Sequence, residues 1–379
     1  MDFSLSKTEI LLQQMLREFS EKEVKPLAAE IDEEERFPVE TVEKMAKLGM
    51  MGIPIPTQYG GAGGTNVMYT MAVEELSRSC ATTGVVLSAH TSLCVSPIYE
   101  FGTEEQKRHY LPNLCSGKWI GAFGLTEPNA GTDASAQQTM ALLDGDHYVL
   151  NGNKIFITNA EFAHVYIIMA MTDKSQGNRG ISAFIVERDF PGFSIGKKEK
   201  KMGIRGSATC ELIFENCIVP KENLLGKEGQ GFKIAMKTLD GGRIGIASQA
   251  VGIAQGAMDE TVKYVKERTQ FGRPIGKFQN TQFQLADLQT KIEASRLLVR
   301  AAAYKKDMKL PYSVDAAYAK LFAAETAMET TVKAVQFHGG YGYTREYPVE
   351  RMMRDAKITE IYEGTSEVQR MVIASHLLK

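Results

Sequence analysis

The chain has 379 residues, which is enough for two or three domains at roughly 100–200 residues each. Hydrophobic residues make up 44% and charged residues 24%, a balance typical of a globular protein with a polar surface. The net charge of −2 gives no electrostatic basis for wrapping nucleic acid or coating an anionic membrane, although it leaves room for a local basic patch.

The cysteines are few and unpatterned. They are Cys80, Cys94, Cys115, Cys210 and Cys217, an odd number without a Cys-x-x-Cys pair. We therefore expect neither a disulfide framework nor a metal site, and we expect a reducing compartment, the cytoplasm. The first residues lack the basic and apolar segments of a signal peptide, and no run of about 18 apolar residues predicts insertion into a membrane.

Residues 1–118 show the periodicity of helices and form the first predicted domain. Ser6 and Glu9 have the spacing of a capping box, and apolar residues then recur every three to four positions. Further helical patterns cover 42–48, 68–78, 84–101 and 104–114, and the Gly-rich stretch 57–66 predicts a loop. We expect the acidic run Asp32 to Glu35 to be a solvated face or turn.

Residues 119–228 form the second predicted domain, and their patterns are typical of short strands. A strand ends in a turn at Asn151-Gly152, and another follows from Lys154 to Asn159. Further strand-like runs cover 165–171, 181–186, 193–195 and 210–219. Because no long helices separate these strands, we expect a small β-barrel or sandwich.

Residues 229–379 return to helical periodicity and form the third predicted domain. Long helical patterns cover 232–268, 279–305, 314–337 and 366–378, with many small alanine positions. Long helices with small residues at regular positions predict a four-helix bundle. The expected fold class is therefore α+β, with helices, then strands, then helices.

One carboxylate near the C-terminus has an unusual setting. Glu363 follows the apolar pair Ile361-Tyr362 and precedes the turn Gly364-Thr365. An exposed glutamate titrates at about 4.3 and is a weak base at neutral pH. Burial against Ile361 and Tyr362 would raise its pKa into the range of a general base, and the N–H groups of the turn could bind a developing anion. Taken alone, an ordinary glutamate beside a turn is the commoner explanation.

Two other segments could contact a ligand. The polar run 122–133 sits between apolar residues, where it could wrap a cofactor or simply connect two domains. Arg268 comes at the end of a helical pattern, where a cation suits the helix dipole. A guanidinium fixed there could instead contact a pyrophosphate.

Two glycine-containing segments also leave alternatives open. Gly339 and Gly340 follow a helical pattern and predict a C-cap, but paired glycines also let a backbone approach a ligand closely. The neighbouring His338 is by itself more often structural than catalytic. Asp240 and Arg243 lie three residues apart on one helical face. They could form a surface ion pair, or they could make polar contacts with a nucleotide-like tail.

Several other enzyme classes lose their main support. The sequence lacks G-x-G-x-x-G after a strand, the P-loop motif, H-E-x-x-H and G-x-S-x-G. A nicotinamide Rossmann enzyme, a P-loop enzyme, a zincin and an α/β-hydrolase are therefore not expected.

Taken together, five segments in order resemble the acyl-CoA dehydrogenase family over essentially the whole chain. They are Leu125-Thr126-Glu127-Pro128, Ile157-Thr158-Asn159, Arg268-Thr269-Gln270-Phe271-Gly272, Gly339-Gly340-Tyr341-Gly342 and Ile361-Tyr362-Glu363-Gly364-Thr365. Each is weak alone, but five in this order on a helix–strand–helix layout are specific. The sequence is most similar to the short-chain branch, the butyryl-CoA dehydrogenases.

The resemblance implies a helical N-terminal domain, a middle β-barrel, a C-terminal four-helix bundle, a homotetramer and bound FAD. The flavin residues that it implies are Phe123, Leu125, Thr126, Thr132, Phe156, Ile157, Thr158, Arg268, Phe271, Gln279, Gln336, Phe337, His338, Gly339, Gly340, Thr365, Ser366 and Glu367. Of these, Arg268, Gln279 and 336–340 would reach the flavin of a neighbouring subunit. The acyl-CoA residues that it implies are Thr132, Asp240, Gly241, Gly242, Arg243 and Gly364.

The resemblance also implies a reaction. Glu363 would remove the α-proton of an acyl-CoA thioester while hydride leaves the β-carbon for the flavin. The backbone N–H of Glu363 and a flavin hydroxyl would stabilise the carbonyl oxygen. Electrons would then pass to an electron-transfer flavoprotein.

Two positions indicate which branch of the family the sequence resembles. In the isovaleryl and long-chain branches the base comes from the position matching Gly242, which has no side chain here. The glutaryl branch uses an Arg near the acyl pocket, whereas the segment 80–94 has no Arg or Lys and carries Gly84 about where that cation would sit. A short monoacid acyl group is expected. Medium-chain preference, an acyl-CoA oxidase and a non-catalytic relative are the alternatives.

Overall fold

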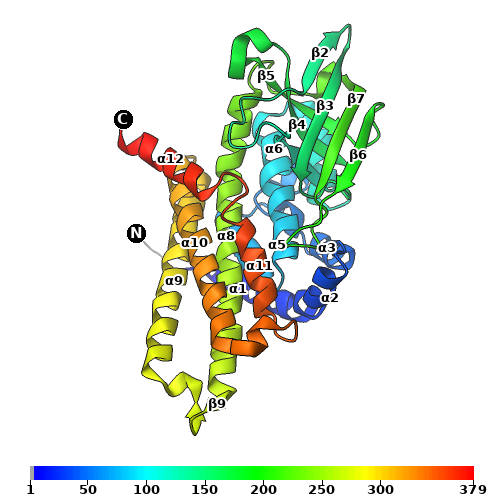
Figure 1. Cartoon of the computed structure of the whole chain (residues 1–379). Helices are drawn as coiled ribbons and strands as arrows, with labels where there is room; N and C mark the ends of the chain where they lie inside the picture. Colours follow the sequence, from blue (N-terminus) through cyan, green and yellow to red (C-terminus); the bar gives the residue numbers. More distant parts are fainter. Residues whose placement is uncertain (1–3) are drawn as a thin grey trace.

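Two helical regions flank a β-sheet region along the chain, which confirms the expected fold class (Figure 1). The computed structural model of the protein describes residues 4–379. The sheet packs at one end of the longest helix, and the C-terminal helices run beside that helix (Figure 1). In the described part of the chain, no helix has both the length and the apolar character needed to cross a membrane.

The N-terminal region is helical, as the periodicity predicts. Its helices are α1 (Lys7–Phe19), α2 (Ala28–Glu33), α3 (Val39–Lys47), α4 (Asn66–Ser79), α5 (Ala81–Ser88), α6 (Ser96–Phe101) and α7 (Glu104–Cys115). The capping box at α1 is present: the Ser6 hydroxyl accepts from the Glu9 N–H, and the Glu9 carboxylate accepts from the Ser6 N–H. The single helix expected over 84–101 is divided, because a π-helical segment, Ala89–Val95, separates α5 from α6.

The acidic run at the end of α2 is not simply solvated. Asp32 is buried and accepts two hydrogen bonds from the Arg354 guanidinium, at 3.1 and 2.7 Å. Arg354 belongs to α11 (Val349–Ile358), a helix that the sequence analysis did not predict. The expectation for Asp32 was wrong because its partner lies more than 300 residues away along the chain, where no local pattern could reveal it.

The middle region holds an eight-stranded sheet. Its strands are β1 (Gly121–Gly124), β2 (Met140–Asp144), β3 (His147–Ile157), β4 (Val165–Met171), β5 (Ile181–Glu187), β6 (Phe193–Lys198), β7 (Cys210–Pro220) and β8 (Leu224–Leu225). They pair in the order β6-β7-β3-β2-β4-β5-β8, and β1 pairs in parallel with β4. β4 and most of β5 are buried and carry the core of this region.

The turn expected at Asn151-Gly152 is absent, because β3 runs through both residues. The register of β3 against β7 shifts between Leu150 and Gly152 and again between Lys154 and Ile157. Gly152 has a φ of 140°, and a side chain there would meet Thr139 at 2.6 Å. The glycine therefore permits an irregularity inside one strand rather than ending it.

The C-terminal region is a helical bundle. Its elements are α8 (Gly231–Glu267), the short pair β9 (Thr269–Gln270) and β10 (Arg273–Pro274), α9 (Gln279–Asp307), α10 (Ser313–His338), α11 and α12 (Ser366–Leu377). The 37 residues of α8 span about 55 Å at 1.5 Å each, so this helix reaches from the sheet to the far end of the bundle (Figure 1). Buried alanines of α8, α9 and α10 share one core.

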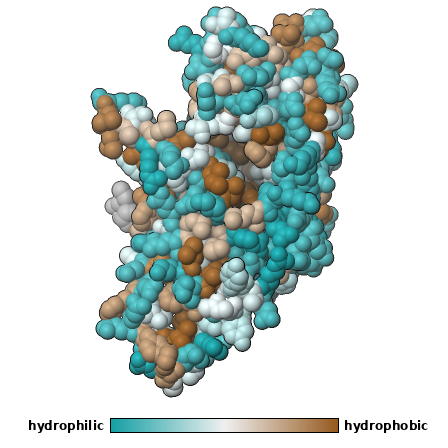
Figure 2. All heavy atoms as spheres, in the orientation of Figure 1, coloured by the Kyte–Doolittle hydropathy of each residue, from teal (hydrophilic) through white to brown (hydrophobic). Residues whose placement is uncertain are grey.

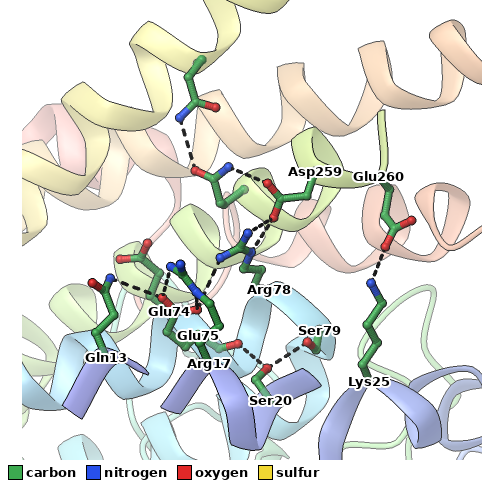
Figure 3. A network of polar contacts seen from close by, with 12 residues as sticks. Gln13, Arg17, Ser20, Lys25, Glu74, Glu75, Arg78, Ser79, Asp259 and Glu260 are labelled. Atoms are coloured by element: carbon green, nitrogen blue, oxygen red, sulfur yellow. Dashed lines mark hydrogen bonds and ion pairs between the residues drawn. The ribbon is translucent and has the colours of Figure 1, made fainter. Parts of the chain in front are cut away.

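Polar contacts join the N-terminal helices to α8 (Figure 3). Arg17 of α1 pairs with Glu75 of α4 at 2.8 Å, and Arg78 of α4 pairs with Asp259 of α8. Lys25 pairs with Glu260 of α8 at 2.6 Å. Partly exposed ion pairs contribute little stability, about 0–1 kcal/mol each, so the fit of the helix backbones matters more.

Glycines of α8 allow α4 to pack closely on it. A Cβ at Gly252 would lie 2.3 Å from the Glu74 carbonyl oxygen, and one at Gly256 would lie 2.2 Å from that of Arg78. Both contacts are with backbone, which cannot move aside as a flexible side chain can. The seam between the N-terminal helices and the bundle therefore requires glycine at these positions.

We predict that Gly256→Ala destabilises the fold by about 1–3 kcal/mol, since overpacking this seam outweighs the better helix propensity of alanine. Urea unfolding measures the change. Gly241→Ala on the same helix is the control, because the nearest atom to its Cβ would be the flexible tip of Lys306, at 3.0 Å. Equal stability of the two variants would contradict the predicted backbone clash.

Candidate active site

A cavity of about 500 Å³ lies where the sheet region meets α5, α8 and the segment between α11 and α12. Hydrophobic residues gather in the hollow between the sheet region and the C-terminal helices (Figure 2). Most of the lining is apolar and includes Val85, Ala89, Leu93, Phe232, Met236, Leu239, Ile358 and Ile361. A largely apolar concave site with a few polar groups is typical of a small-molecule site.

Glu363 lies in this lining, on the segment that joins α11 to α12. Its φ is +56°, and that of Gly364 is +95°, so two consecutive residues adopt left-handed backbone conformations. A positive φ is costly for a residue with a side chain and persists only where the surroundings hold it. Thr365 then begins α12 as its N-cap, with its hydroxyl accepting from the Val368 N–H.

The Glu363 carboxylate packs directly on the backbone of α8 at Gly242. A Cβ at Gly242 would lie 1.9 Å from Glu363 Oε2 and 2.8 Å from Leu93 Cδ2. Any side chain at Gly242 would therefore occupy the space of the carboxylate. The absence of a side chain at Gly242 is a requirement for this position of Glu363.

Burial controls the protonation of Glu363. Glu363 Oε2 is buried and has no hydrogen-bond partner within the described residues 4–379. Burial raises the pKa of this carboxyl to about 8, and the nearby cations Lys320 and Arg243 partly oppose the shift. A carboxyl with a pKa near neutrality that opens into a cavity is suited to act as a general base.

Asp240 and Arg243 form an ion pair at 2.7 Å on α8, and Ser313 also donates to Asp240 at 2.9 Å. This pair is largely buried, so it is not the surface pair that the spacing alone would suggest. Arg243 lines the cavity and its Nε donates to the Glu363 carbonyl oxygen at 3.4 Å. Asp240 supports Arg243 from outside the lining, and Gly241 faces Lys306 instead of the cavity.

The wall opposite Glu363 comes from the sheet region. The predicted flavin residues in this wall are Phe123, Leu125, Thr126, Thr132, Phe156, Ile157 and Thr158. Phe156 has a φ of +60°, and 60% of its surface is exposed. An apolar wall with exposed ring surface and the two hydroxyls of Thr126 and Thr158 is suited to a planar aromatic group with polar edges.

The buried ion pair between Lys154 and Glu127 stabilises this wall. Lys154 of β3 is fully buried and donates to Glu127 at 2.7 Å, to Gln137 at 3.0 Å and to the Leu125 carbonyl at 3.1 Å. Glu127 also accepts from the N–H groups of Gln138 and Thr139. Because these contacts satisfy both charges, they fix the course of the loop that follows β1.

A second group of predicted flavin residues lies elsewhere. Arg268, Phe337, His338, Gly339 and Gly340 line a separate, open cavity of about 500 Å³ at the other end of α8, near β9 (Figure 1). Phe271 and Gln279 are exposed beside it, outside its lining. Within one chain, the structure does not bring this group to the cavity of Glu363.

His338 has a structural environment. Its ring stacks on Tyr264 with centroids 4.2 Å apart, and its Nδ1 contacts the Ala334 carbonyl at 2.8 Å. Burial lowers the pKa of His338, so this residue is neutral at physiological pH.

The remaining predicted flavin residues lie on helix ends. Gln336 lies near the end of α10, outside the lining of the open cavity. Ser366 is buried and Glu367 is exposed, both in the first turn of α12. Thr365 and Gly364 do line the cavity of Glu363.

Sequence reasoning missed two buried lysines, Lys154 and Lys320. Lys320 of α10 donates to the Gly364 carbonyl at 2.7 Å, directly after Glu363. A lysine inside an alanine-rich helical pattern, as Lys320 is between Ala319 and Leu321, is a signal that could have drawn attention.

We predict that Gly242→Ala keeps the fold but pushes the Glu363 carboxylate out of its place, because the carboxylate can move whereas the helix backbone cannot. A crystal structure of the variant should show the displaced side chain. Proton abstraction by Glu363 should slow by about 100-fold or more, as expected for a misplaced base. An unmoved carboxylate with full activity would contradict this account.

Models of the acyl-CoA dehydrogenase family match nearly the whole chain. The N-terminal domain model matches residues 6–118, the middle domain model 122–217 and the C-terminal domain model 229–378. The short-chain specific acyl-CoA dehydrogenase of Clostridium acetobutylicum is 64% identical over 379 residues, 100% of both chains.

Solved structures agree with these matches. Butyryl-CoA dehydrogenase from Megasphaera elsdenii has a TM-score of 0.98 and 53% identity, with 100% of each chain covered. A structure from a study of the electron transferring flavoprotein of Acidaminococcus fermentans has a TM-score of 0.99 and 58% identity, again with 100% of each chain covered. An acyl-CoA dehydrogenase from Bacillus anthracis, solved with FAD, has a TM-score of 0.93 and 36% identity over 99% of this chain and 67% of that one. Its family models and its full-length relatives, together with the carboxylate that lines its apolar cavity, show that this chain belongs to the acyl-CoA dehydrogenase family.

Proposed function

We propose that the protein is an FAD-dependent short-chain acyl-CoA dehydrogenase that interconverts butyryl-CoA and crotonyl-CoA. The observation that carries the proposal is the Glu363 carboxylate, which lines the apolar cavity and whose Oε2 is buried with no hydrogen-bond partner among residues 4–379. Relatives named for short-chain acyl-CoA and for butyryl-CoA support the substrate class over the full chain.

The cavity fits FAD in this role. Phe156 offers exposed ring surface, and Thr126 and Thr158 offer hydroxyls beside it. These residues would hold the flavin ring against the sheet region, facing Glu363 across the cavity. When bound, FAD supplies the acceptor for the β-hydrogen and its electron pair.

Glu363 removes the α-proton in the proposed reaction. The carboxylate takes the proton from the carbon next to the thioester carbonyl and becomes a carboxylic acid, while the C–H electron pair forms the new double bond. The carbonyl oxygen gains charge as the proton leaves, and the nearby backbone N–H of Glu363 would stabilise it. The apolar lining excludes water and keeps the base unsolvated until substrate arrives.

Arg243 and Thr132 would contact the CoA thioester or its tail from the cavity rim, and Gly364 would lie beside the acyl group. The pair with Asp240 holds the Arg243 guanidinium in one direction. Asp240 would act through Arg243 rather than by direct contact, and Gly241 lies outside the cavity lining.

Several exposed apolar residues on the bundle support a homotetramer. They are Phe283, Leu297 and Tyr304 on α9, Tyr318, Phe322 and Val332 on α10, and Met371 and Leu377 on α12. A gathering of exposed apolar side chains marks an interaction site. We propose that other subunits cover these residues and that Arg268, Phe271, Gln279 and 336–340 of one subunit complete the flavin site of its neighbour.

We further propose an electron-transfer flavoprotein as the redox partner, supported by the study from which one solved relative comes. The cytoplasm is the proposed location, since all five cysteines are free and buried, as in reducing compartments.

We predict that Glu363→Gln keeps FAD but slows flavin reduction by butyryl-CoA about 10²–10⁴-fold, because the amide cannot accept the α-proton. Anaerobic stopped-flow absorbance measures the rate. In the unsubstituted enzyme, kcat/KM should rise with pH, reach half its maximum near pH 8 and level off above that, since only the ionised carboxylate is a base and its pKa is raised to about 8.

A wild-type rate in Glu363→Gln would disprove the base assignment. Rates of flavin reduction by acyl-CoAs of increasing chain length test the substrate class. A maximum rate with medium-chain acyl-CoAs would favour an acyl-CoA dehydrogenase of medium-chain preference. Rapid reoxidation by oxygen with peroxide release would favour an oxidase. A protein that binds no flavin would be a non-catalytic relative.

We predict that Arg268→Ala releases FAD and weakens the tetramer together, because the proposed site is shared between subunits. Flavin absorbance and size-exclusion chromatography with light scattering measure both. Arg345→Ala is the control, since Arg345 is exposed and pairs with Glu33 at the surface. Loss of flavin from an unchanged tetramer would argue against a shared site.

A further inference from the structure

Lys320 lies inside the bundle, beneath the segment that carries Glu363. It belongs to α10, and none of its side chain is exposed. Its ammonium donates to the Gly364 carbonyl oxygen at 2.7 Å. No Asp or Glu oxygen lies within 4 Å of this ammonium in the described part of the chain.

A buried ammonium with one carbonyl partner is costly for a fold. Burial lowers the pKa of Lys320 to about 8, and the nearby Glu363 carboxyl opposes this shift. A neutral donor would hold the same carbonyl at lower cost. Such a donor is already present, because Gln369 of α12 donates to the Gly364 carbonyl at 2.8 Å. Packing and hydrogen bonding alone therefore do not account for a lysine at this position.

The segment held by Lys320 needs support. Glu363 and Gly364 both have positive φ, and the carbonyl groups of both accept hydrogen bonds from outside the segment. Gln369 donates to both carbonyls, and Arg243 donates to that of Glu363 at 3.4 Å. Donors from α8, α10 and α12 thus bind two consecutive carbonyl groups. Together they hold the backbone of the turn in its strained conformation.

We propose that Lys320 is a positioning residue for Glu363, holding its turn through the Gly364 carbonyl and favouring its carboxylate form through charge. The inference rests on the proposed role of Glu363 as the base. It assigns two separable effects to one side chain: a hydrogen bond that sets the place of the carboxylate, and a positive charge that sets how readily it ionises.

Other charged and titratable groups surround the pair. Arg243 and Asp240 face it from α8, Tyr69 from α4, Glu360 and Tyr362 from the segment after α11, and Glu367 from α12. Arg243 is the other cation that acts on Glu363, and the carboxylate of Asp240 neutralises it at 2.7 Å. Below its own pKa of about 8, the unpaired charge of Lys320 is therefore the larger of the two cationic effects that favour ionised Glu363.

Removing this charge should make Glu363 harder to ionise. Its pKa rises when the cation is lost, so the pH at which the rate reaches half its maximum moves upward. Removing only a hydrogen bond from the same carbonyl should disturb the position of the base and leave that pH unchanged. Lys320 and Gln369 offer this matched comparison, because both donate to the oxygen of Gly364.

The test compares Lys320→Met with Gln369→Met, both in the FAD-loaded enzyme. Methionine fills a similar volume without a donor or charge. The rate of anaerobic flavin reduction by butyryl-CoA is measured from pH 6 to 10. We expect Lys320→Met to move the midpoint upward by about one pH unit or more and to lower the plateau. We expect Gln369→Met to lower the plateau without moving the midpoint.

A second readout does not depend on the reaction. The infrared band of the protonated Glu363 carboxyl, identified by its absence in Glu363→Gln, is followed during a pH titration of each variant. It should persist to higher pH in Lys320→Met than in the unsubstituted protein or in Gln369→Met. If Lys320→Met does not fold, Lys320→Gln replaces it, since it keeps a donor and loses the charge, and the same upward shift is expected.

An unmoved midpoint and an unmoved carboxyl band in the Lys320 variant would overturn the electrostatic role. A shifted midpoint with an unchanged plateau would overturn the positioning role. A wild-type rate in Glu363→Gln would instead show that the base assignment itself is wrong. The failure of the inference and that of the proposed function are therefore distinguishable.

Discussion

The site depends on one contact, the packing of the Glu363 carboxylate against the backbone of Gly242. This contact buries a charge-bearing group without a hydrogen-bond partner in the described residues, and that is why the pKa of Glu363 rises to about 8. A carboxylate in such a place is unstable by itself. The fold holds it there through the strained turn at Glu363 and Gly364, whose carbonyls accept hydrogen bonds from three helices. A buried carboxylate without a partner and a strained turn, both kept at one place in a cavity, are typical of a functional site.

The long helix α8 relates this contact to the rest of the molecule. Near its start it supplies Gly242 and the Asp240–Arg243 pair to the cavity. Further along, Gly252 and Gly256 let the N-terminal helices pack against it, and its last turn leads to the open cavity around Arg268. One rigid element thus sets the distance between the two groups of predicted flavin residues. This separation within one chain is the physical reason to propose that neighbouring subunits share a site.

Buried lysines stabilise both walls of the cavity. Lys154 neutralises Glu127 and fixes the loop after β1, whereas Lys320 has no acidic partner within 4 Å in the described residues and acts on the Glu363 turn. The two lysines differ in how the burial of charge is offset. The first forms a satisfied ion pair, whose role is structural. The second leaves its charge free to act on the carboxylate across the turn.

Periodicity and short motifs are local properties of the chain, so the order of helices, strands and helices, the capping box at Ser6 and the family could be predicted before the fold was known. The sequence also marked Glu363 as a carboxylate between apolar residues and a turn. The three-dimensional fold was needed to show that Asp32 pairs with Arg354, that β3 continues through Gly152, and that Glu363 Oε2 lies against Gly242. It was also needed to show that Lys320 lies beneath the Glu363 turn. The physical reason is that burial, and with it the pKa of a buried group, depends on residues far apart in the chain, which no local pattern specifies.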